Sequence, residues 1–448
     1  MSRDGDRGAA APGSGILGPT LGLRGRLLTP VTGAGDSAVR YLDDALLVVE
    51  GGRIARVEPF APVTARGAGA AGASGVAGAF TGPVLDLRPA VLVPGFVDTH
   101  VHFPQTRVVG QAGAPLLEWL ERTIFPEEAR FRSEAYARAV APEFTFSLAA
   151  AGTTTACIFG SSDERATDLL FEALAASGLR ALAGVTLMDQ RCPDALRVPR
   201  EAAMAACARL AERWHGHDAG RLGFAVTPRF ALSCSRALME DAARFAEERG
   251  LLVQTHVAEN LAEGVAVLAE HPFAEDYLGI YEAVGLVGKR TLLAHAIHLS
   301  GHEWDRVAAR GASIAHCPDS NFFLGSGRMR LREARARGVA VGLGSDVAAG
   351  RSFDLRRAMA YAYDNALCLG DRLRAQELFT LATLGGARAL GLDGVTGSLE
   401  VGKEADVLAV ELPDHAEGED ALLAQLAFAD AGRVTRAWVR GVGVYARR

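Results

Sequence analysis

The 448-residue sequence contains very little lysine, with only Lys289 and Lys403 among its 47 basic residues. Arginine supplies the rest of the positive charge, and the formal net charge is −6. An acidic chain without a basic stripe lacks the electrostatic footprint of a nucleic-acid-binding protein. We therefore expect no nucleic-acid partner.

The sequence also lacks a CxxC pair among its six cysteines and lacks any apolar run of about 18 residues. Scattered cysteines are typical of free thiols rather than of a disulfide framework. Residues 1–15, MSRDGDRGAAAPGSG, contain no apolar core of a signal peptide and are predicted to form a disordered tail. These absences favour a cytoplasmic protein that is not inserted in a membrane.

The middle of the chain contains eight short apolar runs, each of which ends in polar residues. Such runs suit strands that are buried on both faces of a parallel sheet. They cover residues 91–102, 153–159, 181–189, 223–230, 251–259, 291–299, 312–318 and 339–346. Segments of helical composition separate them, among them 133–151, 200–213, 235–249 and 352–368. Ser235 is expected to cap one helix, and Ser300 with Glu303 to form a capping box on another.

Eight strand–helix units over this length predict a (β/α)8 TIM barrel. A doubly wound open sheet is the alternative, but the glycine-rich phosphate loop expected after its first strand is missing. Shorter strand-like segments lie at both ends of the chain, with Gly51-Gly52 as a hairpin turn between two of them. We expect residues 16–90 and 391–448 to form one composite β-sandwich domain beside a hydrolase barrel domain over residues 91–390.

Polar residues at the ends of the predicted barrel strands should converge, because catalytic groups of TIM barrels lie at the C-terminal strand ends. His100 and His102 end the first strand as HxH, which places both imidazoles on one face. His256 ends the fifth strand, His295 the sixth and Asp346 the eighth. Each alone would be a core histidine or a helix cap, but their common position predicts a metal site.

Three histidines and an aspartate suit Zn²⁺ with an open position for water, whose pKa the metal lowers toward ~7. Glu259 is then free to move protons, while Asp346 can bind both metal and water. His295 is either a ligand or a donor that orients the water. No lysine lies on a predicted barrel strand to bridge two ions, so we expect one metal per subunit.

Longer motifs around these residues resemble the amidohydrolase superfamily, in its single-metal deaminase branch, and specifically the guanine deaminases. The motifs are PGFVDTHVH (94–102), HFPQ (102–105), PLLEWLERTIFPEE (115–128), GTTTACIF (152–159), TPRFALSCS (227–235), HVAE (256–259), ASIAHCPDSN (312–321), GLGSDVAAG (342–350) and LATLGGARALGLD (381–393). The similarity runs from about residue 88 to 410. It implies a zinc-dependent hydrolase of C–N bonds in cyclic amidines, converting guanine to xanthine and ammonia in purine catabolism and salvage.

The resemblance also implies roles for individual positions. The metal ligands would be His100, His102, His256 and Asp346, and the catalytic groups Glu259, His295 and Asp346. Gln105, Arg229 and Phe230 would hold the purine, with Leu116 and Trp119 on the pocket wall. A homodimer is expected because family members are commonly dimeric. The chemistry agrees, since Arg229 suits a carbonyl oxygen and Gln105 offers both a donor and an acceptor.

Other functions remain open on the sequence alone. A deaminase of the same branch that acts on 8-oxoguanine, a pterin or a triazine would share the metal and glutamate but change the pocket. A catalytically silent barrel scaffold would be expected to have lost ligands, and here all are present. A zinc deaminase of the cytidine type would show H-x-E and P-C-x-x-C, and neither occurs.

Overall fold

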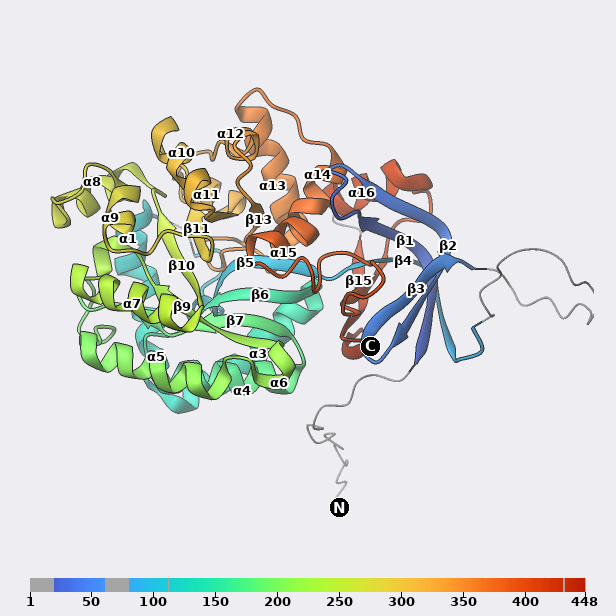
Figure 1. Ribbon diagram of the computed structural model, residues 1–448, viewed down its shortest axis with the longest axis horizontal. Coiled ribbons are helices and arrows are strands. Elements are labelled where there is room, and N and C mark those ends of the chain that lie inside the picture. Colours follow the sequence, from blue (N-terminus) through green and yellow to red (C-terminus); the bar gives the residue numbers. More distant parts are fainter. Residues whose placement is uncertain (1–19, 61–79, 112, 430–431, 448) are drawn as a thin grey trace, which may run out of the picture.

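Two sheets organise the chain in the computed structural model, which describes residues 20–60, 80–111, 113–429 and 432–447 (Figure 1). The tail expected over residues 1–15 lies outside the described residues. One sheet is parallel and forms the barrel, and the other combines strands from both ends of the chain. The predicted fold class, a TIM barrel with a small composite β-domain, is confirmed.

Eight parallel strands of the described chain follow one another around the barrel. They are β5 (Phe96–His102), β6 (Thr153–Phe159), β7 (Arg180–Gly184), β9 (Leu222–Pro228), β10 (Leu252–Val257), β11 (Thr291–His295), β12 (Ser313–His316) and β13 (Val341–Leu343), with the short β8 (Thr186–Leu187) beside β9. Backbone bonds close the ring. The Asp346 N–H donates to the His100 carbonyl at 2.8 Å, and the His102 N–H to the Val347 carbonyl at 3.3 Å. The first and last strands therefore meet at the end that carries the predicted site.

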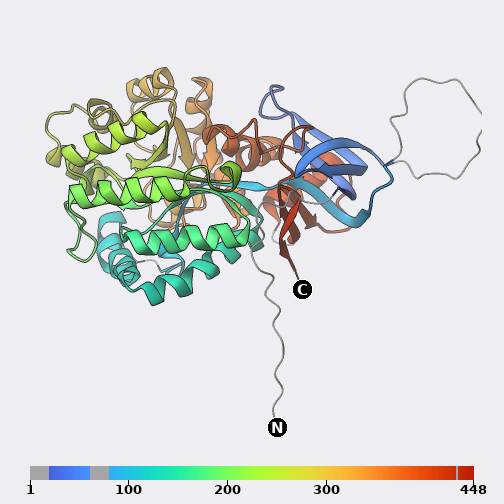
Figure 2. The ribbon, with the colours of Figure 1, turned by 60° about the horizontal axis from the view of Figure 1, so that its bottom comes forward.

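Helices form an outer layer around these strands, as Figure 2 shows for the teal and green part of the chain. The longer ones are α3 (Glu134–Ala151), α4 (Glu164–Ser177), α5 (Arg200–Trp214), α7 (Arg236–Arg249), α8 (Leu261–Glu270), α9 (Tyr277–Ala283), α10 (Gly301–Arg310) and α13 (Leu355–Cys368). The shorter ones are α6 (His217–Gly220), α11 (Pro318–Phe323), α12 (Leu331–Ala336), α14 (Ala375–Thr380) and α15 (Gly386–Ala389). A further helix, α16 (Gly418–Phe428), packs against α13, α14 and a strand of the other sheet. Ser235 caps α7, and Ser300 with Glu303 forms the capping box of α10, as the sequence predicts.

The composite sheet has the strand order β16-β15-β14-β4-β1-β2-β3 among the described residues. Its strands are β1 (Leu21–Pro30), β2 (Val39–Glu50), β3 (Arg53–Pro59), β4 (Val84–Pro94), β14 (Val407–Glu411), β15 (Arg433–Val439) and β16 (Val442–Ala446). The expected hairpin joins β2 to β3, with positive φ at Gly51 and Gly52. The antiparallel pairing of β4 with β14 joins the two ends of the chain.

The first predicted barrel strand, 91–102, is divided in the structure, and this part of the prediction is wrong. Residues through Pro94 belong to β4 and pair with β14, whereas β5 begins at Phe96. Between them, Gly95 passes so close to Thr154 that a Cβ would lie 1.9 Å from the Thr154 hydroxyl oxygen. Only glycine fits beside Thr154, so the chain crosses from the composite sheet to the barrel at Gly95.

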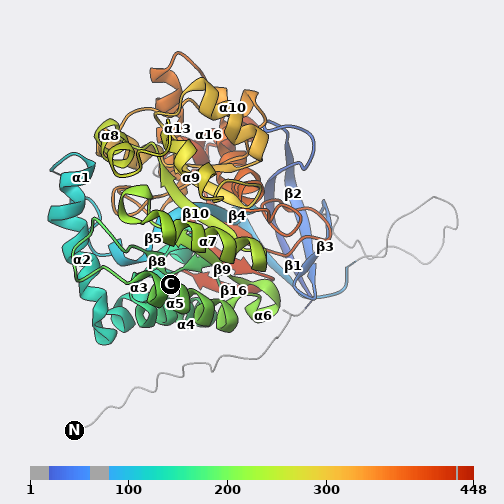
Figure 3. The ribbon, with the colours of Figure 1, turned by 60° about the vertical axis from the view of Figure 1, so that its left-hand side comes forward.

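A short helical segment lies on the side of the molecule away from β1, β2 and β3, in both Figure 1 and Figure 3. It consists of α1 (Leu116–Trp119), a π-helical turn η2 (Leu120–Ile124) and α2 (Phe125–Ala129). Widened turns of this kind are rare and frequently mark functional sites. Among the described helices, none combines the length and apolar character needed to cross a membrane.

Candidate active site

Four side chains from three strand ends place their donor atoms at one point at the mouth of the barrel. The Nε2 atom of His102 lies 3.1 Å from that of His100 and 3.3 Å from that of His256. The Asp346 Oδ1 atom lies 3.3 Å from the Nε2 atoms of both His100 and His102. Donors about 2.05 Å from a tetrahedral zinc ion stand ~3.3 Å apart. These separations are those of donors that share one cation, and a further position on the cation would remain for water.

The charge state of this donor cluster also suits a cation. Burial lowers the pKa of His100, His256 and His102, that of His102 to about 3, so the imidazoles are neutral. Burial alone would raise the pKa of Asp346, but His100 and His102 hold it well below its usual value. Neutral imidazoles and an ionised carboxylate are the forms that bind metal.

The tautomer of His256 is fixed from outside the cluster. Its Nδ1 atom lies 2.6 Å from the carbonyl oxygen of Arg229, which can only accept a hydrogen bond. Nδ1 therefore carries the proton, and the Nε2 lone pair faces the cluster.

Cys317 is a potential ligand that the sequence analysis did not consider. It lies in a second group of possible ligands with His100, His295 and Asp346. Burial raises the pKa of its thiol well above the usual value, and the Sγ atom contacts the Ala315 carbonyl oxygen at 3.6 Å. A buried thiol with a raised pKa is a weaker ligand than the imidazoles, because thiolate is the form that binds metal.

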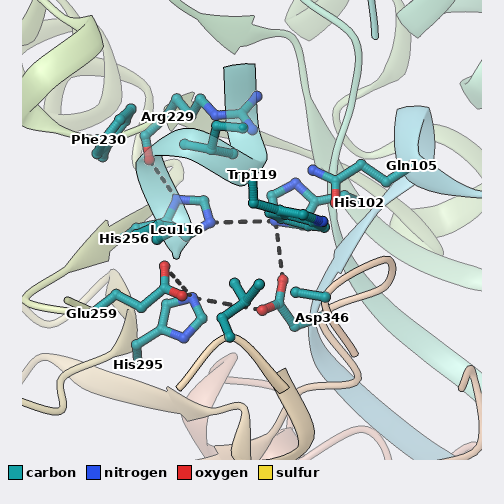
Figure 4. A pocket seen from close by; sticks show the side chains of 13 residues that line it. His102, Gln105, Leu116, Trp119, Arg229, Phe230, His256, Glu259, His295 and Asp346 are labelled. Atoms are coloured by element: carbon teal, nitrogen blue, oxygen red, sulfur yellow. Dashed lines mark hydrogen bonds and ion pairs between the residues drawn. The ribbon is translucent and has the colours of Figure 1, made fainter. Parts of the chain in front are cut away.

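Glu259 and His295 stand beside the donor cluster rather than within it (Figure 4). The His295 Nε2 atom lies 3.5 Å from Glu259 Oε2 and 3.8 Å from Asp346 Oδ2. Burial, with a contribution from Asp346, raises the pKa of Glu259 to about 8. A carboxyl group with a pKa near neutrality is suited to accepting and releasing a proton.

The backbone is strained at two of these positions. His295 and Asp346 both adopt left-handed conformations, with φ of 72° and 48°. Such angles are uncommon for residues other than glycine, and they persist where the surrounding structure holds them in place. At Asp346 the holding contact is the backbone hydrogen bond to His100 described above. Both residues line one cavity.

A cavity opens over these groups, with about 400 Å³ of empty space that includes its open mouth. Its walls include every site residue predicted from the sequence except His100, which is buried. The lining residues are His102, Gln105, Leu116, Trp119, Leu120, Arg229, Phe230, His256, Glu259, His295, Leu324, Asp346 and Ala349. The cavity thus combines a donor cluster, a buried carboxyl group suited to proton transfer and an apolar wall that can cover a flat ring.

Two polar side chains in the upper half of Figure 4, Arg229 on the left and Gln105 on the right, share a partner that the sequence analysis missed. Glu128 of α2 accepts hydrogen bonds from Gln105 Nε2 at 3.1 Å and from an Arg229 Nη atom at 2.6 Å. The side-chain amide oxygen of Gln105 (Oε1) in turn accepts a hydrogen bond from the Ala348 N–H at 3.0 Å.

Two further residues of the site were not predicted. Asn321 Oδ1 lies 2.9 Å from His295 Nδ1, and Ser326 Oγ lies 3.3 Å from Glu259 Oε1. Glu128 and Asn321 occur in motifs that carried the family resemblance, so a signal for them was present. Ser326 lies outside those motifs, and no signal in the sequence distinguished it.

The comparisons with known proteins agree on one group. The model of the amidohydrolase family matches residues 91–444. A probable guanine deaminase of Deinococcus radiodurans is 43% identical over 92% of this chain and 95% of its own length. The solved E. coli guanine deaminase is 37% identical, with a TM-score of 0.87 over 95% of this chain and all of that chain. The guanine deaminase of C. acetobutylicum, solved with guanine in its active site, is 29% identical, with a TM-score of 0.86 over 95% of this chain and all of that one. The chain therefore belongs to the amidohydrolase family and, within it, to the guanine deaminases.

Proposed function

We propose that this protein is a guanine deaminase that hydrolyses guanine to xanthine and ammonia in purine catabolism and salvage. The observation that carries the proposal is one cavity that joins the donor cluster and Glu259 to the Gln105–Arg229 pair. The first part supplies hydrolysis, and the second suits a base with a carbonyl group and ring nitrogens. Family membership over nearly the whole chain supports the same substrate.

We propose Zn²⁺ as the metal, one ion per subunit, held by His100, His102, His256 and Asp346. The donor spacing and the three neutral imidazoles support zinc over the hard cations that prefer oxygen ligands. When bound, such an ion lowers the pKa of a water molecule so that hydroxide is available at neutral pH.

The side chains of this chain then carry the proton transfers. Arg229 donates to the carbonyl oxygen of the base, and Gln105 pairs with its ring edge, so C2 faces Glu259. Glu259 takes a proton from the attacking water as the C2–O bond forms, and delivers it to a ring nitrogen. It then transfers the second proton to the amino group as the C2–N bond breaks, releasing ammonia. His295 and Asp346 orient the attacking oxygen. Their contacts also stabilise the charge that develops at the tetrahedral centre.

Oxidised purines, pterins and triazines are the alternative substrates, because the donor cluster and Glu259 do not distinguish among them. A silent scaffold is disfavoured because the complete set of donors converges with distances suited to a cation. A homodimer and a cytoplasmic location remain predictions. The first rests on the family resemblance, and light scattering of the purified protein tests it. The second rests on the scattered cysteines and on the lack of a long apolar run in the sequence.

The decisive experiment measures ammonia release and metal content together. The purified protein is incubated with guanine, 8-oxoguanine, adenine, cytosine, pterin and ammeline. We expect turnover of guanine to xanthine and about one zinc ion per chain. Glu259→Gln should lower kcat by about two to four orders of magnitude and retain the metal, because the glutamate transfers protons without binding the ion.

The matched control is Glu270→Gln, the same substitution at a glutamate on α8 that pairs with Arg191 and does not line the cavity. It should leave kcat within about twofold of the original value, as is usual for surface substitutions. Turnover of another base alone would reject guanine as the substrate and keep the mechanism. Absence of turnover with every base, with the metal bound, would support the scaffold.

A further inference from the structure

Glu128 lies behind the cavity wall and contacts two residues that line it. It belongs to α2, whereas Gln105 follows β5 and Arg229 follows β9. All three side chains are almost completely buried. One carboxylate oxygen accepts from Gln105 and the other from Arg229. Glu128 itself is absent from the cavity lining, so it can act on a ligand only through its two partners.

The contact with Glu128 determines which way the Gln105 amide points. Its NH2 group donates to Glu128, and its carbonyl oxygen accepts from the Ala348 N–H. A reversed amide would place its NH2 group against the Ala348 N–H and its oxygen against a carboxylate, and both contacts are repulsive. The fixed amide keeps one N–H and one lone pair for a ligand.

The same carboxylate holds the guanidinium of Arg229 from one side. The short contact to Glu128 and the Phe125 ring, 5.3 Å from the Arg229 Cζ atom, occupy part of its surface. Because the Glu128 carboxylate neutralises the charge of the guanidinium, the remaining N–H groups of Arg229 act as fixed hydrogen-bond donors and not as an unpaired positive charge. This arrangement favours a neutral carbonyl oxygen over an anionic group.

We propose that Glu128 is a specificity-determining positioning residue, whose carboxylate orients Gln105 and Arg229 so that the cavity selects a neutral base carrying a carbonyl next to a ring N–H. The inference rests on the proposed function and adds to it the residue that sets the base preference. It distinguishes guanine from 2-aminopurine, which has the same reactive amino group but lacks the carbonyl and the adjacent N–H.

The test compares both bases in the protein with bound metal. Glu128→Gln should lower kcat/KM for guanine by about tenfold to a hundredfold, since charge-assisted hydrogen bonds are lost. For 2-aminopurine the change should stay below about threefold, so the guanine preference falls. Glu128→Asp, which keeps the charge but shortens the reach, should recover part of the preference.

Glu127→Gln is the matched control. Glu127 is the neighbouring residue on α2 and is equally buried, but it bonds to Arg130 and Tyr136 instead of the cavity residues. Its replacement should leave the ratio of the two bases unchanged. In a Gln105→Ala background, Glu128→Gln should have a smaller effect on the ratio than in the original protein, because one of its two routes of action has been removed.

Binding measurements separate this inference from the proposed function. In a Glu259→Gln background, displacement of fluorescent 2-aminopurine by guanine gives both affinities without turnover. A lower guanine preference in Glu128→Gln supports the inference, even if the unmodified protein fails to deaminate guanine and the proposed function is rejected. An unchanged ratio of the two affinities, with or without an equal loss for both bases, would overturn the inference. Glu128 would then be only the partner of Arg229 in a structural ion pair.

Discussion

The imidazoles of His256 and His295 are each oriented by a hydrogen-bond partner outside the donor cluster. The Arg229 carbonyl fixes His256, and the Asn321 amide oxygen faces Nδ1 of His295. With Nδ1 protonated toward Asn321, the Nε2 atom of His295 faces Glu259 and Asp346 without a hydrogen bond to the protein. In the proposed mechanism, Asn321 therefore sets which nitrogen of His295 is available to the attacking water.

Asn321→Ala should lower kcat by about tenfold to a hundredfold, which is the usual effect of losing an outer partner of a metal site. KM and metal content should change little, because neither the wall nor the donor cluster is altered. Steady-state kinetics and metal analysis check this expectation. The matched control is Asn365→Ala, a buried asparagine on α13 that donates to the Met329 carbonyl outside the site. A loss of kcat as large in the control would mean that Asn321 acts only through packing.

The helices and strands begin and end where local chemistry dictates, and these features were the ones best predicted from the sequence. The apolar run 153–159 has the bounds of β6, and Ser300 caps α10 as expected. Several other runs overshot, because the polar residues at their ends belong to loops. Within the run 339–346, only the three residues of β13 form a strand.

The capping box of α10 gives an element-level prediction. The Ser300 hydroxyl accepts from the Glu303 N–H, and the Glu303 carboxylate accepts from the Ser300 N–H at 2.8 Å. Ser300→Ala should lower the free energy of unfolding by about 1 kcal/mol, with unchanged kcat. Urea unfolding followed by tryptophan fluorescence measures it. Ser147→Ala, in the interior of α3, should have almost no effect because alanine favours helix there. Similar losses in both variants would argue against a capping contribution.

The contacts missed from the sequence are those that join distant segments. Glu128 bonds to Arg229 across 101 residues, and Asn321 to His295 across 26. Periodicity and capping motifs report only on neighbours within a few residues, so they carry no information on such pairs. The common position of polar residues at strand ends was enough to gather the donor cluster. The side chains that orient it required the closed barrel.

The barrel and the composite sheet are joined by a buried cluster of charges near the start of β7. Arg180 contacts the Asp406 carboxylate at 3.1 Å and that of Glu404 at 2.5 Å, and Arg440 reaches Glu404 at 2.8 Å. Burial alone would raise the pKa of Glu404, but Arg180 and Arg440 hold it below its usual value. Ionised Glu404 therefore stabilises the folded protein at pH values above the pKa that it has in the unfolded chain. This contribution is lost as the pH falls through its lower pKa in the folded protein.

Arg180→Met should lower the free energy of unfolding at pH 7 by about 3 kcal/mol, because it leaves two buried carboxylates short of a cation. The pKa of Glu404 should rise in the variant, so the deficit should shrink as the pH approaches about 4 and the carboxylates take up protons. Urea unfolding at several pH values measures both effects. The control is Arg53→Met, because Arg53 approaches the same Glu404 at 3.6 Å from the solvent side and is 57% exposed. That change should cost about 0.5 kcal/mol or less. A pH-independent deficit at Arg180 would show that packing, rather than charge, joins the barrel to the composite sheet.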